Sequence, residues 1–166
     1  PITSRVIARR RKPRHGWRIG APTGASFLRN RSLAMSVVVT PFLRKALLLD
    51  AAVSAAVGIV LLAATDYLAE LLALPAALLF WAGVIIFVWV AMLVVASMRA
   101  VLPQIVALNF VAGNAIWTVA SFAIMLAGLI QPNALGIAFV SAQALAVGLF
   151  AVLQWIGSRE RAIVRA

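Results

Sequence analysis

The sequence of 166 residues contains no cysteine and a single histidine, His15. Without cysteine, the chain forms no disulfide and offers no thiolate ligand to a metal. One histidine cannot supply both axial ligands of a bis-histidine haem, and zinc and copper lose their usual ligands. We therefore expect no metal site and no cofactor.

Charged residues are also scarce, at 11% of the chain against about 25% in an ordinary soluble domain. Only four residues are acidic, and none of them precedes Asp50. The sequence has no glycine-rich phosphate loop followed by lysine, and no pair of carboxylates within an apolar stretch. General acid–base or nucleophilic catalysis therefore has few candidate groups. We expect no catalytic residue and no enzymatic activity.

Hydrophobic residues, by contrast, make up 64% of the chain, and the mean hydropathy is +1.06. A soluble domain of this size cannot bury so much apolar surface, so the composition indicates an integral membrane protein. Four apolar stretches are each long enough for the roughly 20 residues that a helix needs to cross the hydrocarbon layer. They are residues 42–64, 76–97, 104–130 and 134–156.

These stretches must be helical, because an unclosed strand would leave backbone groups unpaired in lipid. Short connections make consecutive spans antiparallel neighbours. The sequence thus predicts an all-α fold, a four-transmembrane-helix antiparallel bundle within residues 35–158. Between the first two spans, Thr65 or Asp66 is expected to cap a short helix that ends before Pro75.

The charges of the body predict its orientation. Arg44 and Lys45 precede the first span, Arg99 joins the second and third, and Arg159 and Arg161 follow the fourth. The opposite side carries Asp66 and Glu70. By the positive-inside rule, both termini are cytoplasmic (N-in/C-in), and residues 159–166 form a short basic cytoplasmic tail.

Nine of the fifteen basic residues lie before Met35, within residues 1–34. Proline and glycine punctuate this segment and no apolar period runs through it, which is typical of a disordered tail. Several interpretations stay open. In the first three, the tail binds anionic lipid, serves as a transit peptide or contacts nucleic acid. In the fourth, residues 1–34 lie upstream of a native start at Met35. For the protein as a whole we expect no nucleic-acid partner.

Polar residues inside the spans form the candidate site, an intramembrane polar network. Its members are Asp50, Asn109, Asn114, Ser121, Gln143 and Gln154. Because an unbonded amide in lipid is costly, we expect these side chains to point inward and bond across helices. For Asp50 three interpretations compete: an interfacial carboxylate paired with Arg44 or Lys45, a proton or cation site, or a helix-packing group.

Small residues at helical spacing mark the expected contact faces. Asp50, Ser54 and Gly58 share one face of the first span, and Ala144 and Gly148 share one face of the fourth. Such spacings let helix backbones approach closely.

Short motifs within residues 41–158 resemble those of small, uncharacterised bacterial inner-membrane proteins with four spans. The matching segments are Phe42-Leu43-Arg44 with Asp50, Leu74-Pro75, Asn114-Ala115-Ile116-Trp117 with Ser121, Leu135-Gly136, Gln143-Ala144 and Leu153-Gln154. The resemblance implies a multi-pass protein of the bacterial inner (plasma) membrane, and it brings no activity and no functional residue.

Two functions are consistent with these features. The first is a non-enzymatic accessory, scaffold or assembly subunit, whose surroundings are the lipid bilayer and a membrane-complex partner or further copies of the chain. The alternative is a small oligomeric transporter or channel that uses the polar cluster around Asp50.

Overall fold

A computed structural model describes residues 36–160 of the chain. The expectations for residues 1–34, for a start at Met35 and for Arg161 lie outside the described residues. Within the described range the chain forms five helices and two three-residue strands. In chain order these are β1 (Ser36–Val38), α2 (Pro41–Ala63), α3 (Thr65–Leu72), α4 (Ala76–Ser97), β2 (Val101–Pro103), α5 (Gln104–Leu126) and α6 (Ala134–Arg159).

Four of these helices, α2, α4, α5 and α6, are long and apolar enough to cross a membrane, as the sequence predicts. Helix α4 has the predicted bounds, and α2 begins one residue earlier than expected, at Pro41. The Thr40 hydroxyl caps α2 by accepting from the Leu43 N–H at 3.2 Å, and Pro41 follows at a position where its missing N–H costs nothing. Asn133 caps α6 in the same way.

Helix α5 is shorter than predicted and ends at Leu126 instead of residue 130. Gly128 adopts a left-handed backbone with φ 68°, and the Leu129 N–H donates to the Ile124 carbonyl at 3.0 Å. This is a Schellman ending, in which a left-handed glycine closes the last turn and satisfies its carbonyls. Apolar character continues through residues 127–130, so hydropathy alone overestimates the helix.

The short helix α3 forms where expected, but its predicted cap is wrong. Ala64 occupies the cap position without a side-chain bond, whereas the Thr65 hydroxyl donates backward to the Leu61 carbonyl at 2.6 Å. Because the chain passes almost without a break from α2 into α3, Thr65 already has a helical carbonyl within reach. The cap position therefore falls one residue before the threonine.

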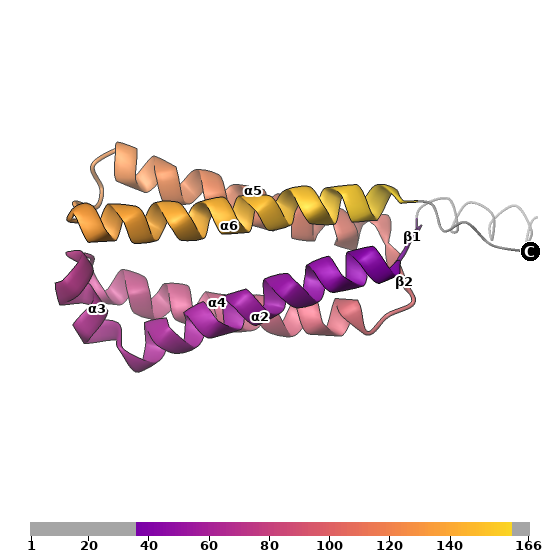
Figure 1. The fold of residues 1–166 in the computed structure, drawn as a ribbon, viewed down its shortest axis with the longest axis horizontal. Coiled ribbons are helices and arrows are strands. Elements are labelled where there is room, and N and C mark those ends of the chain that lie inside the picture. The colour runs from indigo at the N-terminus through magenta and orange to yellow at the C-terminus, as the bar shows by residue number, and fades with distance from the viewer. Residues whose placement is uncertain (1–35, 161–166) are drawn as a thin grey trace, which may run out of the picture. The chain divides into compact units, whose positions relative to one another are not determined.

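Contacts at each end of the long helices join segments that are far apart in sequence. At one end, β1 pairs with β2 and places Val37 opposite Leu102, in a segment where the sequence predicts only a tight connection (Figure 1). The Thr40 hydroxyl also donates to Glu160 at 3.0 Å. At the other end, the Asn133 amide donates to the Leu71 carbonyl at 2.8 Å.

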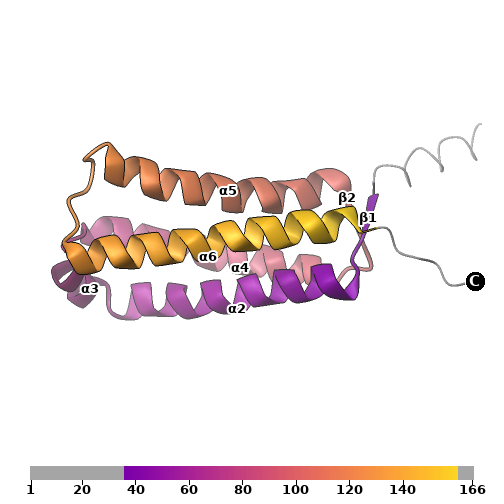
Figure 2. The same cartoon turned by 45° about the horizontal axis from the view of Figure 1, so that its top comes forward.

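The long helices lie side by side, with α2 packed on α4 and α6, and α5 packed on α6 (Figures 1 and 2). The α2–α4 contact is close because glycines face it from both sides. A Cβ added to Gly83 would lie 2.8 Å from the Leu62 side chain, and one added to Gly58 would lie 3.0 Å from Ile86. The expected contact face of the first span thus contains Gly58, as its spacing predicts.

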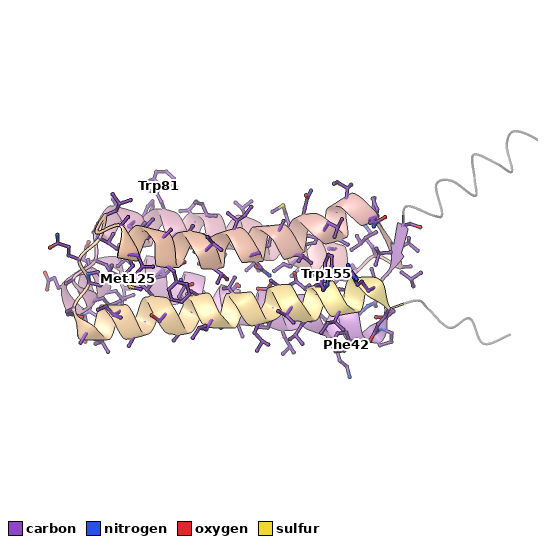
Figure 3. The ribbon with its side chains drawn as sticks, turned by 90° about the horizontal axis from the view of Figure 1, so that it is seen from above. Phe42, Trp81, Met125 and Trp155 are labelled. Carbon is purple, nitrogen blue, oxygen red and sulfur yellow. The ribbon has the colours of Figure 1, made fainter. Side chains whose placement is uncertain are left out.

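Much of the helix surface remains apolar and uncovered by protein. Trp81, for example, is 61% exposed and projects outward from α4 in Figure 3. The buried apolar residues form two clusters, one toward β1 and β2 around Leu47 and Leu93, the other toward α3 around Leu72 and Val140. Exposed aromatic and aliphatic side chains over such long helices indicate contact with lipid rather than water.

Candidate functional site

Asp50 lies at the centre of a hydrogen-bonded network that joins three helices. Its side chain is 0% exposed although it projects from an apolar stretch of α2. One carboxylate oxygen, Oδ1, accepts from the Ser54 hydroxyl at 3.0 Å on the next turn of α2. The other, Oδ2, accepts from Asn114 Nδ2 on α5 and from Gln154 Nε2 on α6, each at 2.7 Å. The side chain therefore connects α2, α5 and α6 through hydrogen bonds of 2.7 to 3.0 Å.

The interpretation of Asp50 as an interfacial residue paired with Arg44 or Lys45 is wrong. Both basic side chains are exposed, and Arg44 donates to the carbonyl of Arg99 at 3.4 Å instead. Because a helix turns by about 100° per residue, residues five and six positions before Asp50 point to other sides of α2. The carboxylate turns into the protein and its nearest basic neighbours turn outward.

Asn114 and Gln154 also bond to each other. Asn114 Nδ2 lies 3.3 Å from Gln154 Oε1, and both residues are almost fully buried. Each of the two amides thus contacts the carboxylate and its amide neighbour. Three of the four buried members of the predicted set, Asp50, Asn114 and Gln154, thus form one cluster.

A second polar cluster lies along the contact between α5 and α6. The indole N–H of Trp117 donates to Gln143 Oε1 at 3.0 Å, and Gln143 Nε2 donates to the Ser121 hydroxyl at 3.1 Å. Ser121 in turn donates to the Trp117 carbonyl at 2.8 Å. Between the two clusters, the Thr118 hydroxyl lies 3.1 Å from the Ala144 carbonyl, so it bridges the same two helices.

Asn109 does not belong to either cluster, which corrects the predicted set. Its side chain is exposed on α5, and no hydrogen bond joins it to the network in the part of the chain that the structure describes. Asn109 precedes Asn114 by five residues, a rotation of about 140° around the helix. The two amides cannot face the same interior.

The candidate set lacks Ser54 in the cluster around Asp50, and it lacks Trp117 and Thr118 along the contact between α5 and α6. The sequence contains a signal for Ser54, because a serine four residues after an aspartate lies directly above that aspartate on a helix. The small size of Ser54 suggested only a contact face, and its hydroxyl proves to be a donor to the carboxylate.

Two adjoining cavities lie among the long helices beside these clusters. The first, of about 110 Å³, is lined from all four long helices and reaches Ser54, Asn114 and Gln143, but not Asp50. The second, of about 190 Å³, extends toward α3 and reaches Ser121. Trp117 and Gln143 line both cavities. Helix α4 contributes aliphatic side chains and Trp89 to these walls, whereas the hydroxyl and carboxamide groups lie on the sides of α2, α5 and α6.

The fully buried polar atoms of the interior are all paired within the chain itself. In residues 36–160, no fully buried side-chain nitrogen or oxygen lacks a hydrogen-bond partner. The same residues contain no group of three His, Cys, Asp or Glu side chains placed to hold a metal ion. The arrangement is suited to holding helices together, because each strong donor near Asp50 is already directed at its carboxylate.

Comparison of the chain with models of protein families, with curated proteins and with solved structures finds no match. The class that the structure supports is a multi-pass membrane protein with four apolar helices. The interpretation of its interior therefore depends on the geometry of the network alone.

Substitutions of Asp50 test whether its bonds stabilise the fold. Asp50→Asn and Asp50→Ala both remove the charge, but an asparagine oxygen still accepts from Asn114 and Gln154, while its amide donates to Ser54. Alanine removes the acceptor of Gln154 Nε2 and leaves Asn114 Nδ2 with only its 3.3 Å bond to Gln154. A buried donor left unpaired costs about 1–3 kcal/mol in proteins. We expect the Ala variant to be less stable than the Asn variant by about 2 kcal/mol.

The measurement is reversible unfolding in a bilayer mimetic, followed by loss of helix–helix contact. The matched control is Asn109→Ala, which removes an exposed amide from α5 and should change the free energy of unfolding by less than about 0.5 kcal/mol. Equal stability of the two Asp50 variants would show that the network contributes nothing.

Proposed function

We propose that this chain is a non-enzymatic membrane protein that acts as an accessory, scaffold or assembly subunit. The observation that carries the proposal is the enclosure of Asp50, whose two oxygens accept three donors from the same chain. A catalytic or ion-binding carboxylate needs access to its substrate, whereas this one is 0% exposed and lies outside the walls of both cavities. A saturated carboxylate instead serves to hold three helices in one arrangement.

The proposal places the four long helices as an antiparallel bundle in the bacterial inner membrane, with both termini in the cytoplasm. Basic side chains at the start of α2, between α4 and α5, and at the end of α6 support this orientation through the positive-inside rule. They are Arg44, Lys45, Arg99 and Arg159. The acidic residues Asp66 and Glu70 lie on α3, at the other end of the long helices. They support the assignment of that end to the non-cytoplasmic side.

The absence of cysteine from the sequence makes this orientation easy to test. Single-cysteine variants at two exposed connections, Ala100→Cys and Gln131→Cys, are treated in intact bacterial cells with a membrane-impermeant maleimide. We expect Gln131→Cys to react in intact cells and Ala100→Cys only after permeabilisation, because the arginine beside Ala100 keeps that connection inside. The reverse pattern, or reaction of both in intact cells, would contradict N-in/C-in.

A small oligomeric transporter or channel is the second candidate. The observation that favours it is the first cavity, whose wall includes polar side chains from three helices, Ser54, Asn114 and Gln143. At about 110 Å³ this cavity does not amount to a pathway through the membrane. Transport would therefore need further copies of the chain to complete the path.

Proteoliposomes separate the two candidates. For an accessory subunit, vesicles with the wild-type protein and with Asp50→Asn should both pass protons at the rate of protein-free vesicles, because the carboxylate has no open route to either side. A proton flux that appears with the wild type and disappears with Asp50→Asn would favour the transporter.

Purification from native membranes in a mild detergent supplies the positive evidence. We expect a membrane partner to accompany the wild-type chain in a fixed ratio. Recovery of the chain in pure form, without a partner, would contradict the role of an accessory or assembly subunit.

A further inference from the structure

One oxygen of the network is not used by the protein. Both bonds that Asn114 makes through its side chain come from Nδ2, and its Oδ1 accepts no hydrogen bond from any described residue. Asn114 is 3% exposed, yet no fully buried polar atom in the described range lacks a partner. An unpaired Oδ1 must therefore retain some exposed surface, and Asn114 lines the first cavity. We take Asn114 Oδ1 as a hydrogen-bond acceptor that a bound molecule can use.

Apart from Ser54, Asn114 and Gln143, the wall of this cavity is apolar or aromatic. Ile85, Ile86 and Trp89 of α4 face Val147 and Phe150 of α6 across it, and Trp117 leads into the second cavity. No basic side chain lines either cavity, and the carboxylate of Asp50 does not reach them. Neither an anion nor a cation finds a counter-charge here. The chemistry favours an uncharged molecule with an apolar body.

The dimensions set the size of that molecule. The two adjoining cavities measure about 110 and 190 Å³. An engineered protein cavity of about 150 Å³ lined by aliphatic and aromatic side chains holds one benzene ring. A single six-membered ring thus suits this space, and aromatic walls pack well against an aromatic ring. The cavity lies along the seam where α4, packed on α2, faces α5, packed on α6.

We propose that this cavity binds an uncharged, single-ring aromatic alcohol of the phenol class. The ring packs between the side chains of α4 and α6, and the hydroxyl donates to Asn114 Oδ1. The site is separate from the subunit or transport role of the chain, because it uses an amide oxygen that takes no part in the bonds between the helices.

The probe is phenol, titrated into the protein in lipid nanodiscs and followed by the indole N–H resonances of ¹⁵N-labelled tryptophan. Trp117 lines both cavities and reports binding, while Trp81, exposed on the outside of α4, reports partition into lipid. We expect a saturable shift at Trp117 and only a linear shift at Trp81. Linear shifts at both would mean that phenol enters the lipid alone, and would overturn the proposal.

Toluene tests the hydrogen bond, since it has nearly the shape of phenol without the hydroxyl. Loss of one buried hydrogen bond corresponds to binding weaker by about tenfold. Equal saturable affinities of phenol and toluene would show that Asn114 Oδ1 takes no part. This comparison uses the wild-type protein and so does not depend on the folding of any variant.

Two substitutions on α6 locate the site. Ala146 lines the first cavity, so Ala146→Leu should fill it and abolish the saturable shift at Trp117 without touching the polar network. Ala142 is exposed on the same helix, and Ala142→Leu adds the same side chain outside the cavity and should leave phenol binding unchanged. Undiminished binding by Ala146→Leu, or equal loss in both variants, would overturn the assignment.

Discussion

A carboxylate inside the hydrocarbon layer must find hydrogen-bond donors, because lipid supplies none and an uncompensated charge there is costly. Asp50 finds them on its own helix and on two others, through Ser54, Asn114 and Gln154. Each of these donors comes from a different helix and has little freedom to turn elsewhere. The carboxylate therefore determines which faces of α2, α5 and α6 point inward. The remaining contacts between these helices depend on that orientation.

Helix α4 has no part in this network, and its position follows from packing. Glycines at its interface with α2 let the two backbones come close, so α4 packs against α2 by shape. Its other inward side chains, Ile86 and Trp89 among them, meet the polar sides of α5 and α6 across the cavities. Polar bonds hold three helices and close packing holds the fourth. The interior space lies where these two modes of contact meet.

Hydropathy was sufficient to predict the four long helices, and the bounds of α4 agree with the expected span. The ending of α5 could not be found in this way, because it depends on the left-handed backbone of Gly128 within a sequence that stays apolar. The pairing of β1 with β2 was equally hidden, since three-residue strands carry no periodic signal. The first feature depends on a local backbone conformation, and the second on a contact between segments far apart in the sequence.

The sequence predicts most residues of the candidate site, but it does not predict which hydrogen bonds join them. Polar residues in apolar stretches are conspicuous, and Asp50, Asn114 and Gln154 do meet. Which of them meet depends on the rotation of each helix, which the sequence leaves open. Because the rotation of each helix is not known from the sequence, Asn109 was wrongly expected in the network. For the same reason, a pair between Asp50 and Arg44 or Lys45 was among the interpretations.

A double-mutant cycle between Asp50 and Gln154 measures whether the Asp50 side chain couples α2 and α6 energetically. Unfolding free energies of the wild type, Asp50→Ala, Gln154→Ala and the double variant are measured in the same bilayer mimetic. We expect a favourable coupling energy of about 1–2 kcal/mol, because the 2.7 Å bond from Gln154 Nε2 to Asp50 Oδ2 is lost in either single variant. Additive effects, within about 0.3–0.5 kcal/mol, would contradict it.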